Sequence, residues 1–230
     1  MLLYTRIYDY ISKNRFRKIF NPKIIQKQVN METFLRVLDP IDTSTGGGSA
    51  SAISGAMAGS LIAMVARLSV PDQEGDVEQE IIDRIFFQSK QLSQMLMQGG
   101  EEDAQAFQLI RSAYQLARQT EDEKNLRQQA IQSAWQKATR VPLENAERCI
   151  QVYGLGAELV SHANPKAISD LRCGLLLAHA GFFGCLENVK INLPSIKEAT
   201  ISAEIIVKAN DLRSQFKSIQ LSHDSLSTDL

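Results

Sequence analysis

The 230-residue sequence is poor in cysteine and in net charge, and both shortages exclude classes of protein. Its three cysteines, Cys149, Cys173 and Cys185, are too few and too scattered for a disulfide scaffold, and no CxxC or Cys/His spacing suggests a metal site. A formal net charge of −1 gives no bulk electrostatic basis for binding nucleic acid. The N-terminus lacks the apolar run of a secretory signal. We therefore expect a cytoplasmic protein with free thiols and no bound metal.

Strand signals are almost absent, because β-branched residues are sparse and alternation does not persist. Apolar residues recur instead at helical spacing from Met31 onward, and 44% hydrophobic content is enough for one sizeable core. We expect an all-α fold, a single-domain bundle of long helices, with Phe107, Tyr114 and Trp135 in its core. The helices are expected near 31–38, 49–68, 81–98, 101–117, 121–139, 142–161, 168–192 and 196–219, with breaks at Gly99-Gly100 and at Val141-Pro142-Leu143.

The charge is unevenly distributed along the chain. Residues 1–30 hold seven Lys and Arg against one acid, Asp9, so this segment carries +6 and residues 31–230 carry −7. We interpret 1–30 as a basic N-terminal extension that is either appended to the fold or lies upstream of a start at Met31. A targeting or membrane-surface segment is the alternative. The helical domain is expected to span 31–220, with a flexible polar tail at 221–230.

The most unusual motif is the run of three glycines, Gly46, Gly47 and Gly48, followed by Ser49. A glycine loop that leads into a helix can present backbone N–H groups to an anion or an electron-rich ligand, and Ser49 is suited to cap the helix. A mobile linker before a buried helix is the alternative interpretation.

The helix that follows the glycines is uncharged for 18 residues, which touches the lower limit for a membrane span. It is rich in small side chains, which favours a tightly packed buried helix and no transmembrane segment. The small residues repeat every four positions, at Ser51, Gly55, Gly59 and Ala63. This face permits close contact with another helix, either in a second copy of the chain or within one subunit.

Five separated parts of the sequence follow one pattern between 31 and 211. They are GGGSASA at 46–52 with MVARL at 64–68, DAQAF at 103–107, VPL at 141–143 with AE at 146–147, NP at 164–165 with SDL at 169–171, and GCLENVKINL at 184–193. In this order they resemble the C-terminal domain of the formimidoyltransferase-cyclodeaminase family, which includes stand-alone methenyltetrahydrofolate cyclohydrolases. The resemblance implies a helical enzyme, usually a homodimer, that acts on a one-carbon-substituted tetrahydrofolate without a bound cofactor.

The resemblance makes Asp103 and Asp170 the candidate catalytic residues. Cyclisation of 5-formimidoyltetrahydrofolate needs a base for the N10 proton, an acid for the departing ammonia and negative charge beside the cationic 5,10-methenyl product. Without the resemblance, each aspartate would be interpreted as a helix-start acid. The candidate substrate-binding residues are Gly46, Gly47, Gly48, Ser49, Asn164, Ser169, Asn188 and Asn192.

The two asparagines Asn188 and Asn192 are four residues apart, so both amides lie on one helix face. Buried amides can pair with the donors and acceptors along a pterin edge. A polar clasp between helices is the alternative for this pair, and a turn cap is the alternative for Asn164.

We expect the protein to be a formimidoyltetrahydrofolate cyclodeaminase, with methenyltetrahydrofolate cyclohydrolase as the alternative reaction at the same site. A third interpretation is a non-catalytic helical dimer that binds folate or another protein. It is suggested by an acidic stretch at 72–80, where many members of the family carry a Lys-rich segment. The expected partners are a reduced folate and a second copy of the chain.

Overall fold

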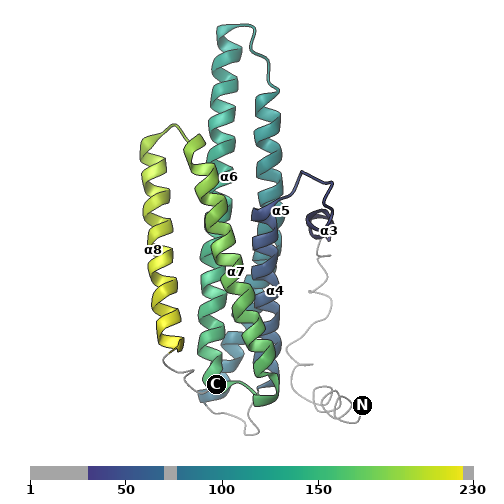
Figure 1. The fold of residues 1–230 in the computed structure, drawn as a ribbon, viewed down its shortest axis with the longest axis vertical. Coiled ribbons are helices and arrows are strands. Elements are labelled where there is room, and N and C mark those ends of the chain that lie inside the picture. Colours follow the sequence, from purple (N-terminus) through teal and green to yellow (C-terminus); the bar gives the residue numbers. More distant parts are fainter. Residues whose placement is uncertain (1–30, 70–76, 225–230) are drawn as a thin grey trace. The chain divides into compact units, whose positions relative to one another are not determined.

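Helices alone make up the secondary structure that the computed structural model describes, which covers residues 31–69 and 77–224 (Figure 1). The expected all-α bundle is therefore confirmed. The six α-helices are α3 (Glu32–Leu38), α4 (Gly47–Leu68), α5 (Val77–Tyr114), α6 (Glu121–Leu159), α7 (Ile168–Asn192) and α8 (Ala199–Asp224), with 3₁₀ turns η2 (Val160–His162), η3 (Pro165–Ala167) and η4 (Leu193–Ser195). The expectations for 1–30, for 70–76 and for 225–230 fall outside the described residues and stay predictions.

The small-residue helix α4 lies at the centre of the bundle and packs against α5, α6 and α7. A Cβ atom on Gly55 would lie 2.5 Å from the Cys149 sulfur of α6, and one on Gly59 would lie 2.8 Å from the Ser89 carbonyl of α5. The small-residue face is thus used for contacts within one subunit. Among the described helices α4 is also long and apolar enough to cross a membrane, but 61% of its apolar window is buried inside the bundle, so composition alone does not establish a span.

The break expected at Gly99-Gly100 is wrong, because α5 continues through both glycines. A Cβ atom on Gly99 would overlap the side chain of Asn145 on α6, whose Nδ2 donates a hydrogen bond to the Gly99 carbonyl at 3.1 Å. The Gly100 carbonyl accepts a hydrogen bond from Ser49 Oγ of α4 at 3.0 Å. Gly99 therefore allows α5 to approach α6, whereas a Cβ atom on Gly100 would make only ordinary contacts, at 3.4 Å and more. Local sequence cannot distinguish such glycines from a helix end.

The break expected at Val141-Pro142-Leu143 is also wrong, because α6 continues through Pro142. Proline has no N–H group, so the carbonyl of Ala138, four residues earlier, loses its partner within the helix. Asn192, at the end of α7, donates its Nδ2 to this carbonyl at 2.9 Å. A bond between helices thus replaces the bond missing within α6.

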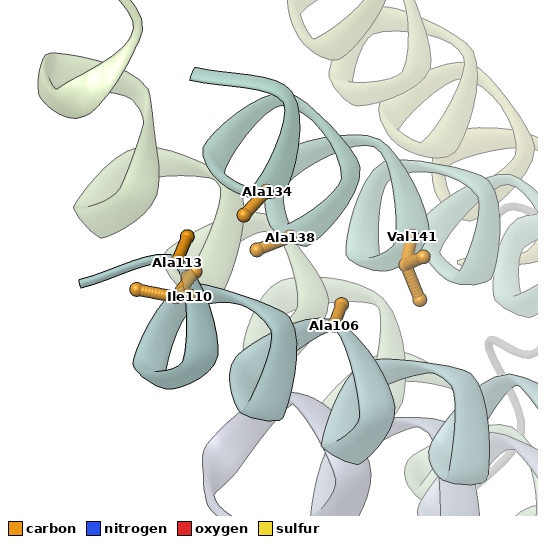
Figure 2. Packing of buried hydrophobic residues seen from close by; sticks show 6 residues of the cluster. All are labelled: Ala106, Ile110, Ala113, Ala134, Ala138 and Val141. Atoms are coloured by element: carbon orange, nitrogen blue, oxygen red, sulfur yellow. The ribbon is translucent and has the colours of Figure 1, made fainter. Parts of the chain in front are cut away.

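A buried apolar seam joins the C-terminal part of α5 to the first half and middle of α6 (Figure 2). It consists of Ala106, Ile110 and Ala113 of α5 and Ala134, Ala138 and Val141 of α6. Four of these six side chains are alanines, which let the two helices approach closely. Ile131 and Trp135 pack against the edge of the seam, where a crevice follows the two helices.

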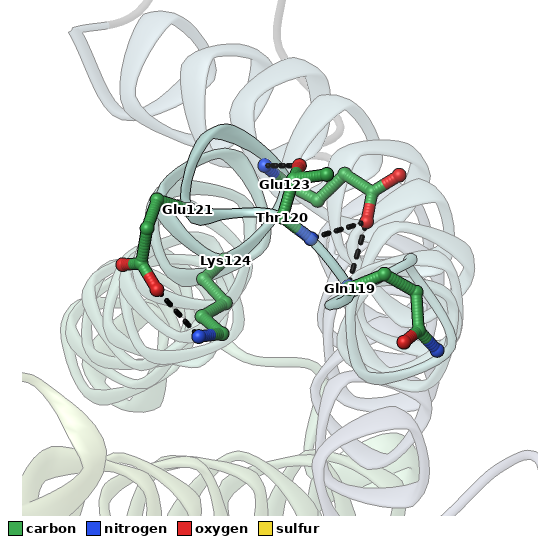
Figure 3. A network of polar contacts seen from close by, with 5 residues as sticks. All are labelled: Gln119, Thr120, Glu121, Glu123 and Lys124. Atoms are coloured by element: carbon green, nitrogen blue, oxygen red, sulfur yellow. Dashed lines mark hydrogen bonds and ion pairs between the residues drawn. The ribbon is translucent and has the colours of Figure 1, made fainter.

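The turn between α5 and α6 is closed by a capping box (Figure 3). Thr120 Oγ1 accepts a hydrogen bond from the Glu123 N–H at 3.2 Å. The Glu123 carboxylate in return accepts from the N–H groups of Thr120 and Gln119, at 3.0 and 2.7 Å. These bonds satisfy N–H groups that a helix start leaves free and fix the beginning of α6 at Glu121, as the sequence predicted.

We predict that Gly99→Ala destabilises the protein by about 1–3 kcal/mol, because the added methyl group overlaps the Asn145 side chain. Gly154→Ala is the matched control inside α6. Its methyl group would lie 3.7 Å from Ile219, an ordinary contact, and the helix propensity of alanine should stabilise the protein by up to about 1 kcal/mol. Denaturant unfolding measures both changes, and equal values for the two variants would contradict close packing at Gly99.

Candidate functional site

A pocket of about 200 Å³ lies at the N-terminal end of α4. We call it the Asp103 pocket. Its walls come from the segment before α4 and from α4, α5, α6 and α7. It is lined by Thr43, Ser44, Thr45, Gly46, Gly48, Asp103, Ala104, Phe107, Ile110, Trp135, Ala138, Asn188 and Asn192. The fold therefore brings together residues from three of the five sequence stretches.

The glycine run forms the start of α4 instead of a loop before it. Gly46 is the N-cap residue, and the helix begins at Gly47, so Ser49 lies in the first turn and is not the cap. A Cβ atom on Gly48 would overlap the Asp103 carboxylate, whereas one on Gly46 would meet nothing within 4 Å. The absence of a side chain at Gly48 thus leaves room for the Asp103 carboxylate.

Asp103 lies well inside α5, not at a helix start, and its carboxylate contacts the first turn of α4. Ser49 Oγ donates a hydrogen bond to Asp103 Oδ2 at 3.0 Å. Burial raises the pKa of Asp103, because it disfavours the charged form, while the Ser49 hydroxyl and the Ser49 backbone N–H act in the opposite direction. A carboxyl group whose pKa is raised, in the wall of a pocket, is a candidate for proton transfer.

Asn188 and Asn192 both line the pocket from α7, as their spacing predicted. Each also has a structural bond, because Asn188 Nδ2 donates to the Gly184 carbonyl at 2.9 Å and Asn192 Nδ2 donates to the Ala138 carbonyl at 2.9 Å. An amide side chain carries two N–H groups and one carbonyl oxygen. Each asparagine therefore keeps a donor and an acceptor that a ligand can use.

Eight of the thirteen lining residues are not among those predicted from the sequence, and three of the eight offer groups that a ligand can contact. Thr45 Oγ1 is buried and has no hydrogen-bond partner among the described residues, which is costly unless a ligand supplies one. Phe107 was expected in the core but is 43% exposed and lines the pocket. Trp135 is only partly buried and lines the pocket as well. Nothing in the local sequence separates these residues from ordinary loop and core positions.

The structure does not bring Asn164, Ser169 and Asp170 to this pocket. Asn164 Nδ2 donates to the Leu68 carbonyl at 2.9 Å and so closes the opposite end of α4. Ser169 and Asp170 lie in the first turn of α7, and the 18 residues from Asp170 to Asn188 correspond to roughly 27 Å along the helix. Because α4 and α7 run antiparallel, the stretches at 46–52 and 184–193 meet at one end of the bundle and the stretch at 164–171 lies at the other.

The described residues contain no cluster of three or more His, Cys, Asp or Glu side chains that could hold a metal ion. All three cysteines are free thiols; Cys149 and Cys185 are buried, and Cys173 is exposed. The carboxyl group of Asp103 is the titratable side chain in the lining of the Asp103 pocket.

We predict that Asn192→Ala destabilises the protein by about 1–3 kcal/mol, because it leaves the Ala138 carbonyl without a partner. The cost should fall in a Pro142→Ala background, where the N–H of residue 142 can pair with that carbonyl. Asn188→Ala is the control, since the carbonyl that it bonds already has a helical partner. Unfolding free energies of the single and double variants give the coupling, and additive values would contradict the replacement of the helical bond by Asn192.

We also predict that Asp103→Asn stabilises the protein at neutral pH. The pKa of Asp103 is higher in the folded than in the unfolded chain, so ionisation of this group lowers stability as the pH rises through the folded pKa. The gain from Asp103→Asn should therefore be present at pH 7 and vanish below about pH 4, where the carboxyl group is protonated in both states. Thermal unfolding across this range measures the difference, and destabilisation at pH 7 would contradict it.

The sequence profile described as formiminotransferase-cyclodeaminase matches residues 30–211. The methenyltetrahydrofolate cyclohydrolase of Methylorubrum extorquens is 32% identical over 174 residues, which cover 76% of this chain and 84% of that protein. The formimidoyltransferase-cyclodeaminase of Rattus norvegicus is 28% identical over 169 residues, which cover 74% of this chain and 31% of that protein. This chain thus corresponds to about a third of the rat protein.

The solved structures include one with the same fold. The crystal structure of formiminotetrahydrofolate cyclodeaminase from Thermotoga maritima matches with a TM-score of 0.70 at 23% identity, over 82% of this chain and 90% of that chain. The profile match extends over more than half of the sequence, and the Methylorubrum relative aligns along most of both chains. The chain therefore belongs to the formiminotransferase-cyclodeaminase family.

Proposed function

We propose that this protein is a folate one-carbon enzyme that acts, in the Asp103 pocket, on the carbon that bridges N5 and N10 of tetrahydrofolate. The observation that carries the proposal is the Asp103 carboxyl group. Burial raises its pKa, and the group lies in a pocket lined by residues from three of the five stretches that resemble the family. The free donors and acceptors of Asn188 and Asn192 and the unpartnered hydroxyl of Thr45 are the groups that would bind the pterin. Phe107 and Trp135 offer apolar surface to its rings.

We propose hydrolysis of 5,10-methenyltetrahydrofolate as the reaction, because the cyclohydrolase relative matches over most of its own length. In this reaction Asp103 takes a proton from water while the water oxygen bonds to the methenyl carbon. The bond from this carbon to N5 then breaks, N5 takes up a proton, and the hydroxyl proton is released. The products are 10-formyltetrahydrofolate and one proton, and the ionised carboxylate stabilises the cationic substrate beside it.

The second candidate is the ammonia-releasing cyclisation of 5-formimidoyltetrahydrofolate, which the identity to the rat protein favours. Here Asp103 would take the N10 proton as N10 bonds to the formimidoyl carbon. The departing nitrogen, which carries one hydrogen in the neutral formimidoyl group, takes up two protons, the one from N10 and one from solvent, and leaves as ammonia, which gives the 5,10-methenyl cation. Both reactions pass through a tetrahedral carbon between N5 and N10, so one carboxyl group can serve either.

An assay with both compounds tests the proposal. The protein should consume 5,10-methenyltetrahydrofolate, and the loss of methenyl absorbance measures this reaction. Formation of the methenyl compound together with ammonia from 5-formimidoyltetrahydrofolate would instead identify the second reaction. Asp103→Asn should lower kcat by about 10²- to 10⁴-fold. Asp170→Asn is the matched control and should retain turnover.

Two outcomes would contradict this account. Binding of reduced folate without turnover of either compound would favour the non-catalytic interpretation. Loss of turnover in Asp170→Asn as well as in Asp103→Asn would show that the Asp103 pocket of one chain does not hold every group that the reaction needs.

We further propose that the protein is a homodimer. Helix α7 leaves an apolar stripe exposed, in which Leu176, Phe183 and Ile191 are 71, 37 and 74% accessible. Large apolar side chains that recur in exposed positions along one helix face are a feature of subunit interfaces. Light scattering should give a mass near twice 25.6 kDa, and Leu176→Glu should shift it toward the monomer. A mass of one chain at micromolar concentration would contradict the dimer.

A further inference from the structure

Ser49 is buried in the first turn of α4, and its hydroxyl group lies between two acceptors of α5. The Gly100 carbonyl oxygen and Asp103 Oδ2 are each 3.0 Å from Ser49 Oγ. A serine hydroxyl group has one proton, so it can donate fully to only one of these oxygen atoms at a time. The sequence made Ser49 a candidate substrate-binding residue, but Ser49 does not line the Asp103 pocket. An effect of its hydroxyl group on the reaction would therefore act through Asp103.

The two acceptors differ in the partners that they have apart from the Ser49 hydroxyl group. The Gly100 carbonyl lies inside α5, so it also accepts the N–H group four residues later in that helix. Among the described residues, the donors to the Asp103 carboxylate are the hydroxyl group and the backbone N–H of Ser49. This N–H group belongs to the first turn of α4 and has no partner within its own helix. The Gly100 carbonyl thus keeps a partner when the hydroxyl proton turns away from it, whereas Asp103 depends on Ser49.

The charge on Asp103 decides which acceptor the hydroxyl proton favours. A hydrogen bond to an ionised acceptor is roughly twice as strong as one between neutral groups. When Asp103 is ionised, the Ser49 proton is therefore best placed on Oδ2. When Asp103 is protonated, both acceptors are neutral, and charge no longer holds the proton on Oδ2. Rotation of one O–H bond connects the two arrangements, because both oxygen atoms already lie 3.0 Å from Oγ.

The surroundings of the Asp103 carboxyl group hold few other charges. The other residues that line the Asp103 pocket, from the segment before α4 and from α4, α5, α6 and α7, are uncharged. On α7, a hydrogen bond with Cys149 and burial hold the pKa of the Cys185 thiol well above its usual range, so this thiol stays neutral beside Asp103. On α5, Glu101 and Glu102 directly precede Asp103, and both are partly exposed. The hydrogen bonds that favour ionised Asp103 therefore come from the first turn of α4.

We propose that Ser49 is a positioning residue for the reaction in the Asp103 pocket, a proposal that rests on the function proposed above. Its hydroxyl proton turns to Asp103 Oδ2 when the carboxyl group is ionised and to the Gly100 carbonyl when the carboxyl group is protonated. Because Ser49 holds Oδ2, Oδ1 is the oxygen that takes the proton from the attacking water. The hydroxyl proton stays on Ser49 throughout, and Asp103 gains and loses its own proton without movement of α4 or α5.

The pH profile of kcat tests the role of the hydroxyl group. Ser49→Ala removes a donor that favours the ionised form, so the pKa of Asp103 should rise and the acidic limb of the profile should move to higher pH. For hydrolysis of 5,10-methenyltetrahydrofolate, kcat on this limb should fall about tenfold, the effect of one charge-assisted hydrogen bond. Above the limb, kcat should fall by less than about threefold. Ser49→Thr keeps the hydroxyl group and should restore the wild-type profile.

Ser93→Ala is the matched control, because Ser93 also joins α5 to α4 through a hydroxyl group. Ser93 Oγ donates to the Ala56 carbonyl of α4 at 2.7 Å. The ten residues from Ser93 to Asp103 extend roughly 15 Å along α5, so this bond is remote from the carboxyl group. The control variant should lose a similar contact between the helices and leave the acidic limb unchanged.

A double-mutant cycle tests the contact without any need for turnover. Unfolding free energies of the wild type, Ser49→Ala, Asp103→Asn and the double variant give the coupling between the two side chains. At about pH 8 the coupling should correspond to about tenfold in the unfolding equilibrium constant, because the ionised carboxylate gains most from the hydroxyl proton. The coupling should vanish below about pH 4, where Asp103 is protonated. The cycle of Ser93→Ala with Asp103→Asn should be additive at both pH values.

Coupling that vanishes in acid, without turnover of either folate, would support positioning by Ser49 and refute the reaction. Turnover with an acidic limb that does not move in Ser49→Ala would support the reaction and overturn the role of Ser49. An equal loss of kcat at every pH in Ser49→Ala and Ser93→Ala would also overturn it, because both serines would then only join the helices. If Ser49→Ala fails to fold, Ser49→Cys, whose thiol is a weaker donor, provides the same comparison.

Discussion

The contact between the first turn of α4 and the Asp103 carboxylate of α5 is the interaction on which the site depends. Gly48 makes the contact possible, because any side chain there would overlap the carboxylate. Burial raises the pKa of Asp103, while Ser49 bonds the ionised form and limits that effect. The fold thus keeps a carboxyl group partly desolvated at a pocket wall and accepts a cost in stability for it, which is a common property of catalytic groups.

The same side chains that build the pocket also hold the bundle together. Asn192 lines the pocket and replaces the hydrogen bond that Pro142 removes from α6. Ser49 Oγ lies 3.0 Å from both the Asp103 carboxylate and the Gly100 carbonyl, so its single hydroxyl proton is shared between two acceptors of α5 and joins α4 to α5 at the site. The side chains that line this pocket therefore also stabilise the bundle. A ligand that uses the remaining donors of Asn188 and Asn192 would contact groups whose orientation is already fixed.

Charge varies along the crevice between α5 and α6 in a way that the net charge of −1 conceals. One end has a carboxyl group and the other has four cations, with Trp135 between them. Charges of opposite sign at two ends would orient a ligand that carries both signs, because the reverse direction would bring like charges together.

The sequence by itself determined the helical class, the family and several helix bounds, because 3.6-residue periodicity and short motifs are local properties. It also identified the glycine run, Asp103 and the asparagine pair of α7. It could not show that α5 and α6 continue through Gly99-Gly100 and Pro142. Asn145 bonds the Gly99 carbonyl and Asn192 bonds the carbonyl that Pro142 leaves free, and both asparagines come from distant parts of the chain. Only the tertiary structure separated Asp170 from Asp103, since the antiparallel packing of α4 and α7 decides which ends of the motifs meet. It alone gathered Arg118, Arg127 and Lys197 around one pocket, because that requires the η4 turn to fold back onto α6.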